Sequence, residues 1–441
     1  MNPQRFLRLV SGAMAALGIS AAAIVALNLR GEDPLPSAET LKPTPALVAQ
    51  GEYLTRVGNC MACHTVQGGA PFAGGRGIET PFGVVYSSNL TPDKATGLGA
   101  WTSAEFWRAM HNGRGKDGRL LYPAFPYTSY THVTREDSDA IFAYLQSLPP
   151  VAQANKAHAL RFPYSTQAAL GVWRALFFTP ADAAQPAAPP PQALAAAQVP
   201  DYQRGASLVN GLGHCAACHT PRNSLGAEQQ GQALAGGLIP VQNWLAPALT
   251  DAGQAGVQRW PQADVVALLK TGVAPQASVI GPMAEVVFRS TQYLSDADAR
   301  AMAVYLQALP QHAATPAKQA VAPASVMERG AKVYEAQCAQ CHGAQGQGAK
   351  DEAGQPAFPP LAGNRAVVLA DPTNLVRVVL QGGYLPATAG NPRPHGMPPF
   401  QHLLGDEDVA AVTTFVRNSW GNQAAGVGTI EVYRARERRS P

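Results

Sequence analysis

The six cysteines of this chain occur in three copies of one motif, and this motif constrains the fold more than any other feature. Each copy has two cysteines three positions apart, with a histidine directly after the second cysteine. The residues are Cys60, Cys63 and His64; Cys215, Cys218 and His219; and Cys338, Cys341 and His342. Because every cysteine belongs to a motif, none remains for a disulfide elsewhere.

The Cys-x-x-Cys-His spacing is that of covalent haem attachment. Two thiols on one helical turn can both reach the vinyl groups of one porphyrin, and the adjacent imidazole then points at the iron. A structural zinc site needs four ligands, and no motif has a second cysteine pair or a second nearby histidine at finger spacing. A thioredoxin-like dithiol needs βαβ surroundings, which the sequence does not predict. We therefore predict three c-type haems, bound by the six cysteines, with the three motif histidines as axial iron ligands.

The motifs belong to a repeated unit. A helical stretch that contains a glycine precedes each motif, and a long Gly/Pro-rich loop region follows it. An amphipathic helix closes each unit. These closing helices are expected near 139–149, 301–310 and 408–417. The repeat predicts all-α domains, in which the opening and closing helices cross over a haem edge.

Local signals set the limits of these elements. Thr134 with Asp137, and Ser295 with Asp298, predict the N-caps of the first two closing helices. Prolines at 149 and 310 are expected to end them. Ala/Pro-rich, weakly charged stretches separate the units and predict extended linkers. The expected domains are unit 1 at 46–165, unit 2 at 196–312 and unit 3 at 322–422.

The 441 residues suffice for two to four domains. With 46% hydrophobic and 14% charged residues, the chain lacks the composition of a disordered protein. Its net charge of +4, without a dense basic tract before the extreme C-terminus, excludes a typical nucleic-acid-binding protein.

The first thirty residues contain an apolar run at 9–29, preceded by Arg5 and Arg8. These 21 residues match the length of a membrane-spanning helix. Because the run does not end in a small-residue cleavage site, we favour an uncleaved anchor over a signal sequence cut near 21–23. Both interpretations place the rest of the chain outside the cytoplasm, because the positive flank stays inside.

The sixth iron ligand separates electron transfer from chemistry at the iron. In unit 3, Met397 stands beside Pro398 and Pro399 in a loop just before the closing helix. In unit 2, Met283 follows Pro282 at the matching position. We predict both methionines as axial ligands.

Unit 1 departs from this pattern, because Phe125 occupies the matching place. Phenylalanine cannot bind iron. Met110 is the tentative axial ligand, His111 and His132 are further candidates, and an open iron remains an alternative.

Two segments outside the units carry possible surface roles. The stretch 167–178 predicts an amphipathic helix, followed within 166–195 by a Pro/Ala linker, and it either contacts a membrane or partner or packs against unit 1. The tail at 423–441 includes a basic run at 434–439, which either contacts lipid or a partner or is solvated.

From about residue 46 to 435 the chain resembles the triheme cytochrome c subunits of membrane-bound bacterial dehydrogenases. The resemblance rests on the three motifs and on the stretches TPFGVVYSSNLTPD at 80–93, LYPAFPYTSY at 121–130 and VRNSWGN at 416–422. It implies three tandem class I cytochrome c domains at the periplasmic side of the bacterial inner membrane.

The resemblance also implies partners. A non-catalytic subunit of this kind takes electrons from a quinoprotein, flavoprotein or molybdenum hydroxylase subunit and passes them to quinone or a terminal oxidase. Phe125 favours the molybdenum class, since relatives that act with alcohol dehydrogenases carry methionine in that loop. A haem enzyme, acting on peroxide or a small sulfur compound at an open unit 1 iron, is the alternative function.

Overall fold

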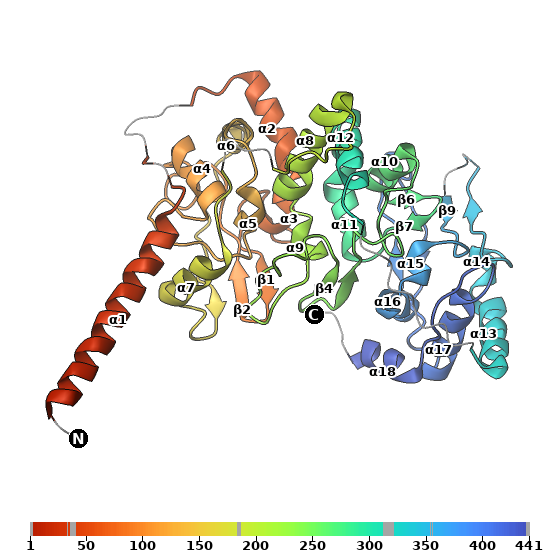
Figure 1. Cartoon of the computed structure of the whole chain (residues 1–441). Coiled ribbons are helices and arrows are strands. Elements are labelled where there is room, and N and C mark those ends of the chain that lie inside the picture. Colours follow the sequence, from red (N-terminus) through yellow and green to blue (C-terminus); the bar gives the residue numbers. More distant parts are fainter. Residues whose placement is uncertain are drawn as a thin grey trace.

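The computed structural model describes residues 3–32, 34–35, 41–182, 187–311, 322–352, 354 and 356–437. Units 1, 2 and 3 lie side by side in sequence order, with unit 2 in the middle (Figure 1). Helix α1 (Pro3–Leu29) extends away from unit 1 (Figure 1). Parts of both predicted linkers, at 183–186 and 312–321, lie outside the described residues, as do residues 438–441 of the tail.

Unit 1 has an opening and a closing helix around a small sheet. Its helices are α2 (Pro45–Val57), α3 (Cys60–His64), α4 (Ser103–Asn112), α5 (Tyr127–Tyr130) and α6 (Arg135–Ser147). Its strands β1 (Gly77–Thr80), β2 (Gly83–Tyr86) and β3 (Ala159–Leu160) form an antiparallel sheet in that order. Helix α7 (Gln167–Phe177) follows the sheet and packs on α1.

Unit 2 opens with the short η1 (Ala196–Gln198) and with α8 (Val199–Ala206), which continues as a π-helical segment, η2 (Ser207–Leu212). The remaining helices are α9 (Ala216–His219), α10 (Gln262–Thr271), α11 (Pro282–Arg289), η3 (Thr291–Tyr293) and α12 (Asp296–Gln307). Two hairpins complete it: β4 (Gly237–Ile239) with β5 (Trp244–Ala246), and β6 (Val273–Ala274) with β7 (Ala277–Ser278).

Unit 3 repeats this plan. Its helices are α13 (Ala324–Gln337), α14 (Ala339–His342), α15 (Arg365–Val368), α16 (Thr373–Gln381), α17 (Asp406–Arg417) and α18 (Thr429–Glu437). Its hairpins are β8 (Ala349–Lys350) with β9 (Pro356–Phe358), and β10 (Gly383–Tyr384) with β11 (Gly396–Met397).

In every unit the opening helix crosses the closing helix at a glycine. A Cβ added to this glycine would lie 1.9, 2.0 or 2.3 Å from a backbone carbonyl oxygen of the closing helix in units 1, 2 and 3. Such distances are too short for any side chain, so only glycine permits this approach. The pairs are Gly51 with Ala140, Gly205 with Ala301, and Gly330 with Ala411.

The predicted helix caps are confirmed. The Thr134 hydroxyl accepts a hydrogen bond from the Asp137 backbone N–H, and the Ser295 hydroxyl accepts one from that of Asp298. The helices that these caps begin, α6 and α12, end at Ser147 and Gln307, shortly before the two prolines.

The all-α prediction expected helices alone, whereas the structure also contains short strands. The strands are two to four residues long and lie in Gly/Pro-rich connections, where the sequence predicts loops. Segments this short do not show the apolar alternation by which strands are recognised. The opening and closing helices are nevertheless the most closely packed pair of elements in each unit.

The stretch 167–178 and the described part of the tail at 423–441, for which the sequence left two interpretations each, are both folded. In α7, Leu170 and Arg174 are buried, so this helix packs against α1 and unit 1 while keeping one exposed face. In the tail, α18 packs on α16 and α17 and buries Val432 and Ala435. The described part of the tail is therefore not a solvated arm.

Units 1 and 2 are joined by buried and half-buried charges. Arg204 of α8 forms ion pairs with Asp298 of α12 at 2.8 Å and with Asp137 of α6 at 3.2 Å. Tyr53 of α2 donates its hydroxyl hydrogen to Asp298 at 2.6 Å. Burial raises the pKa of Asp298, but the hydrogen bonds from Arg204 and Tyr53 lower it further, so its net pKa is depressed. An ionised carboxylate thus holds the two units together.

Replacement of Arg204 by methionine is expected to destabilise this junction by about 2 kcal/mol, because two carboxylates lose their shared cation. Guanidinium unfolding of the purified protein, followed by circular dichroism, measures the change. The control is Arg289→Met, which removes an exposed pair with Glu285 and should cost about 0.5 kcal/mol or less. Equal effects of the two variants would contradict the prediction.

Units 2 and 3 meet through side chains that bind backbone. Asn374 of α16 accepts from the Leu245 N–H at 2.9 Å and donates to the Leu245 carbonyl at 2.7 Å. The fully buried Arg377 donates to the carbonyls of Gln242 and Asn243, and its guanidinium lies 4.7 Å from the Trp244 ring centre. Unit 3 is therefore attached to the β4–β5 hairpin of unit 2.

Candidate functional site

The three motifs form three equivalent short helices, each directly after an opening helix. Helix α3 contains the whole first motif, while Cys215 and Cys338 are the N-cap residues of α9 and α14. Residues three positions apart lie on one side of a helical turn. The two thiols of each motif therefore share a face, as attachment to one porphyrin requires.

The backbone turns sharply before two of the motifs. Asn59 and His214 have φ angles of 53° and 38°, in the left-handed region that few residues adopt. In units 1 and 2 this conformation separates the opening helix from the motif helix, which starts in a new direction.

Each motif histidine is held by a backbone carbonyl. The Nδ1 atoms of His64, His219 and His342 lie 2.7, 2.7 and 3.0 Å from the carbonyl oxygens of Ser88, Pro247 and Pro359. A carbonyl can only accept, so Nδ1 carries the proton and Nε2 keeps its lone pair. Each imidazole is thus oriented and in the tautomer that binds a metal through Nε2.

Burial sets the protonation of the motif. It lowers the pKa of all three histidines, which favours the neutral, ligating imidazole. Burial, with a contribution from the second cysteine, raises the pKa of Cys60 and Cys215 to about 12 and that of Cys338 to about 11. These thiols keep their protons near neutral pH.

These residues fit a covalently bound haem at each motif. Two thiols on one helical face would attach the porphyrin of a c-type haem, and the Nε2 lone pair of the histidine would bind its iron. The hydrogen bond from Nδ1 to a backbone carbonyl holds this imidazole in place. The residues that would hold the groups are those predicted from the sequence. Within the described residues, no cluster of three or more His, Cys, Asp or Glu side chains offers a competing metal site.

The structure places the methionine candidates differently from one another. Met110 of α4 is buried in the apolar cluster against which Cys60 packs. Met283 lies in the first turn of α11, in a small cluster with Val287, and Met397 lies in β11 against the cluster of Val376. Neither of these two clusters includes the motif cysteines of its unit. The role of Met283 and Met397 as iron ligands therefore stays a prediction.

The remaining candidates for the axial ligand of unit 1 are His111 and His132. His111 is buried with its ring stacked on Trp107 at 4.6 Å, and His132 is half-buried. Phe125, at the place of the missing methionine, contacts the Tyr130 ring edge-on at 5.3 Å.

One contact between the first two sites was not foreseen. The ring of Tyr130, at the end of α5, lies 5.7 Å from the ring of His214 in an edge-to-face arrangement. Burial raises the pKa of Tyr130, and the nearby cysteines of the first motif add to this shift. His214 directly precedes Cys215. A ring pair of the buried Tyr130 and the half-buried His214 therefore connects the first and second motifs, and only the position of His214 in the sequence hints at it.

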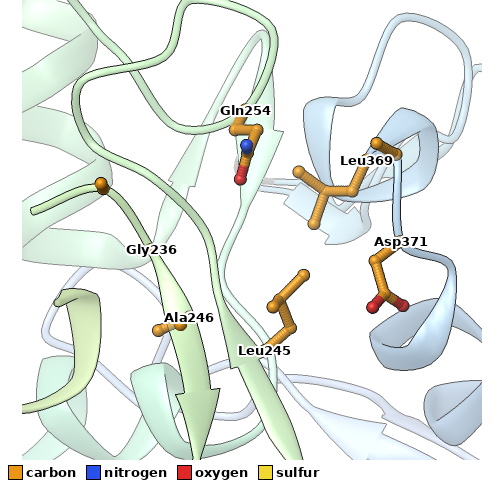
Figure 2. A pocket seen from close by; sticks show the side chains of 9 residues that line it. Gly236, Leu245, Ala246, Gln254, Leu369 and Asp371 are labelled. Atoms are coloured by element: carbon orange, nitrogen blue, oxygen red, sulfur yellow. The ribbon is translucent and has the colours of Figure 1, made fainter. Parts of the chain in front are cut away.

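A cavity of about 270 Å³ lies between units 2 and 3, with Gly236, Leu245 and Gln254 on one side and Leu369 and Asp371 on the other (Figure 2). Gly236 donates its N–H to the carbonyl oxygen of His219, so the cavity borders the second motif. Asp371 is the one ionisable residue among its nine lining residues. This lining lacks the convergent acid and base groups of an active site.

Comparison with known proteins agrees with the repeat. The cytochrome c family model matches residues 48–149, 202–310 and 327–420, which together include all three motifs. The cytochrome c subunit of the quinone alcohol dehydrogenase of Gluconacetobacter polyoxogenes is 38% identical over 92% of this chain and 87% of its own length. The gluconate 2-dehydrogenase cytochrome c subunit of Pantoea cypripedii is 39% identical over 88% of both chains.

A third relative is longer than this chain. This subunit of the nicotinate dehydrogenase of Pseudomonas putida is 40% identical over 85% of this chain, which corresponds to 30% of its own length. The motif geometry, the threefold family match and the near full-length relatives lead to one conclusion: the chain belongs to the cytochrome c family, among the cytochrome c subunits of bacterial dehydrogenases.

Proposed function

We propose that the chain binds three c-type haems and transfers electrons from a catalytic dehydrogenase subunit to quinone or a terminal oxidase. The observation that carries the proposal is the threefold repetition of one donor set, in which each motif histidine is oriented by a backbone carbonyl. Relatives named as cytochrome c subunits of dehydrogenases support it. They favour electron transfer over a haem enzyme at unit 1.

When bound, a haem supplies reversible one-electron exchange at its iron. The protein determines how easily that exchange occurs. The Nδ1–H bond to a carbonyl makes the imidazole a stronger donor, which tunes the reduction potential.

The arrangement of the units supports a chain of centres. Unit 2 lies between units 1 and 3 (Figure 1), and the Tyr130–His214 pair brings the first two motifs together. We infer that electrons cross unit 2 in passing between the outer units.

In units 2 and 3 we propose Met283 and Met397 as the second axial ligands. In unit 1 we propose Met110, because it is buried in the cluster that contacts Cys60. Met110→Leu conserves volume, so a merely structural methionine would be replaced at little cost. We expect instead that about a third of the ferric haem becomes high-spin in the optical and electron paramagnetic resonance spectra. A fully low-spin spectrum would exclude Met110 as a ligand.

The partner and location follow from the relatives and the N-terminus. The partner is a quinoprotein, flavoprotein or molybdenum-containing dehydrogenase subunit, and the relatives named for alcohol, gluconate and nicotinate dehydrogenases are consistent with this range. Residues Leu9–Leu29 of α1 are long and apolar enough to cross a membrane. We place the three units on the periplasmic side of the inner membrane, anchored by α1.

The test is purification from native membranes in mild detergent. We expect the pyridine haemochrome assay to give three haems per chain, and mass spectrometry to identify a stoichiometric dehydrogenase subunit with its cofactor. Fewer than three covalent haems, or a protein that purifies alone under conditions that preserve other respiratory complexes, would overturn the proposal.

A further inference from the structure

The end of α1 is built into unit 1 by hydrogen bonds. Asn28 donates to the Gly171 carbonyl of α7 at 2.9 Å and accepts from Arg174 at 3.0 Å, while its own carbonyl accepts from Arg114 at 3.0 Å. Glu32 pairs with Arg114 at 2.8 Å. We call residues 28–32 the collar.

Two further contacts complete the collar. The Gly31 carbonyl accepts from Asn112 at 2.9 Å, and Arg30 donates to the Phe178 carbonyl. The residues that bind the collar come from α4, from the turn after it, from α7 and from the residue after α7, so the collar is held against unit 1 while Leu29 and Gly31 stay exposed.

Loss of the collar would remove a hydrogen-bond acceptor from Arg174 and a carboxylate from Arg114. Arg174 is buried, and its guanidinium lies 5.0 Å from the centre of the Tyr127 ring and 4.8 Å from that of Phe178. Asn28 supplies a side-chain oxygen to this guanidinium, and Glu32 is the carboxylate paired with Arg114. Arg174 also donates to the Gly113 carbonyl at 3.4 Å, but a buried cation that loses one of its acceptors is costly. A signal sequence that is removed has no need of such contacts.

The collar also sets the depth of α7. At about 1.5 Å per residue, the 21 residues Leu9–Leu29 span about 31 Å, the thickness of a hydrocarbon core. Gly171 of α7 lies beside Ile24 and Asn28, which places α7 within about one and a half helical turns of the end of the span. This is the level of the lipid headgroups.

Three large apolar side chains are exposed on α7 and the preceding turn, where Arg161, Ser165 and Gln167 are exposed as well. Leu176 is 61% exposed, Val172 is 42% exposed, and Phe162 in the turn is 83% exposed. Large apolar side chains rarely gather on a surface that faces only water. They match the interfacial region of a bilayer, into which an amphipathic helix lies with its apolar face down.

We propose that α1 is retained in the mature protein through the collar, and that Phe162, Val172 and Leu176 rest in the bilayer that α1 crosses. These contacts fix unit 1 directly on the membrane surface. With α1 as the only attachment, unit 1 would be free to move relative to the membrane. The inference rests on the proposed membrane-spanning role of α1, and the experiment separates the two.

A photoreactive benzoylphenylalanine is placed singly at Leu17, Leu176 or Tyr384 of the full chain in bacterial membranes that also contain the dehydrogenase. Leu17 lies within the span, and Tyr384 is an exposed control in unit 3. We expect phospholipid adducts at 17 and 176 and none at 384. Absence of lipid at 17 would defeat the membrane span itself. Lipid at 17 alone, a protein adduct at 176, or equal lipid yields at 176 and 384 would overturn the surface contact.

The intact mass of the mature chain tests retention separately. We expect the whole span Leu9–Leu29 and the collar to be present. A mature N-terminus near 21–23, or anywhere after residue 9, would overturn retention of α1, and one after residue 28 would overturn the role of the collar as well. In addition, Asn28→Leu keeps α1 apolar but should increase amide hydrogen exchange around 112–114, whereas Ala26→Leu should not, and equal exchange in the two variants would contradict the collar.

Discussion

A Gly205→Ala variant is expected to lose the packing of unit 2, with a cost of about 3 kcal/mol or more. The added Cβ would lie 2.0 Å from the Ala301 carbonyl oxygen and 2.8 Å from the Tyr305 Cβ. Neither atom is the free end of a flexible side chain, so α8 and α12 must separate. Thermal unfolding of the purified protein and the haem content per chain measure the result.

The matched control is Gly383→Ala in β10, because a Cβ there meets nothing within 4 Å. This variant should leave the unfolding temperature within about a degree or two of the parent, as surface changes usually do. Equal stability of the two variants would show that the helix crossing in unit 2 does not depend on glycine.

Replacement of both Cys215 and Cys218 by serine is expected to stop electron transfer between the outer units. Without covalent attachment the second haem is lost, and unit 2 separates the remaining centres (Figure 1). The expected haem content is two per chain, and the dehydrogenase complex should lose quinone reductase activity while still reducing the first haem it contacts. Flash reduction followed by optical spectroscopy measures the transfer.

A conservative variant separates this effect from misfolding. His214→Asn tolerates the left-handed backbone at 214 and leaves the second motif intact, while it removes the ring contact with Tyr130. We expect it to keep three haems and most of the transfer rate. Unchanged transfer in the cysteine variant would mean that the outer units exchange electrons without unit 2.

The parts that could be predicted were those set by local chemistry. The Thr134 and Ser295 caps, the closing helices and the motif helices each depend on residues within a few positions of one another. The carbonyl partners of the motif histidines lie 17 to 28 residues away, so no local pattern identifies them.

Contacts between residues far apart in the chain could not be predicted from a single sequence. The glycines of the opening helices were visible as a repeat, but their close approach to Ala140, Ala301 and Ala411 depends on how two helices cross. The charges around Arg204 are 67 and 94 residues from it. Unit 1 illustrates the same limit, because a missing methionine at 125 does not reveal which other side chain faces the iron.

The two junctions between units differ in what evolution can change. Between units 1 and 2, a substitution at Arg204 must be matched at Asp137 and Asp298, so the two surfaces are bound to change together. Between units 2 and 3, Asn374 and Arg377 bind main-chain atoms at 242, 243 and 245, and every amino acid supplies the carbonyls that they use. Unit 2 can therefore vary its side chains at 242, 243 and 245 without losing these hydrogen bonds, whereas Trp244 and Ser278, whose side chains contact Arg377 and Asn364 of unit 3, are less free to change.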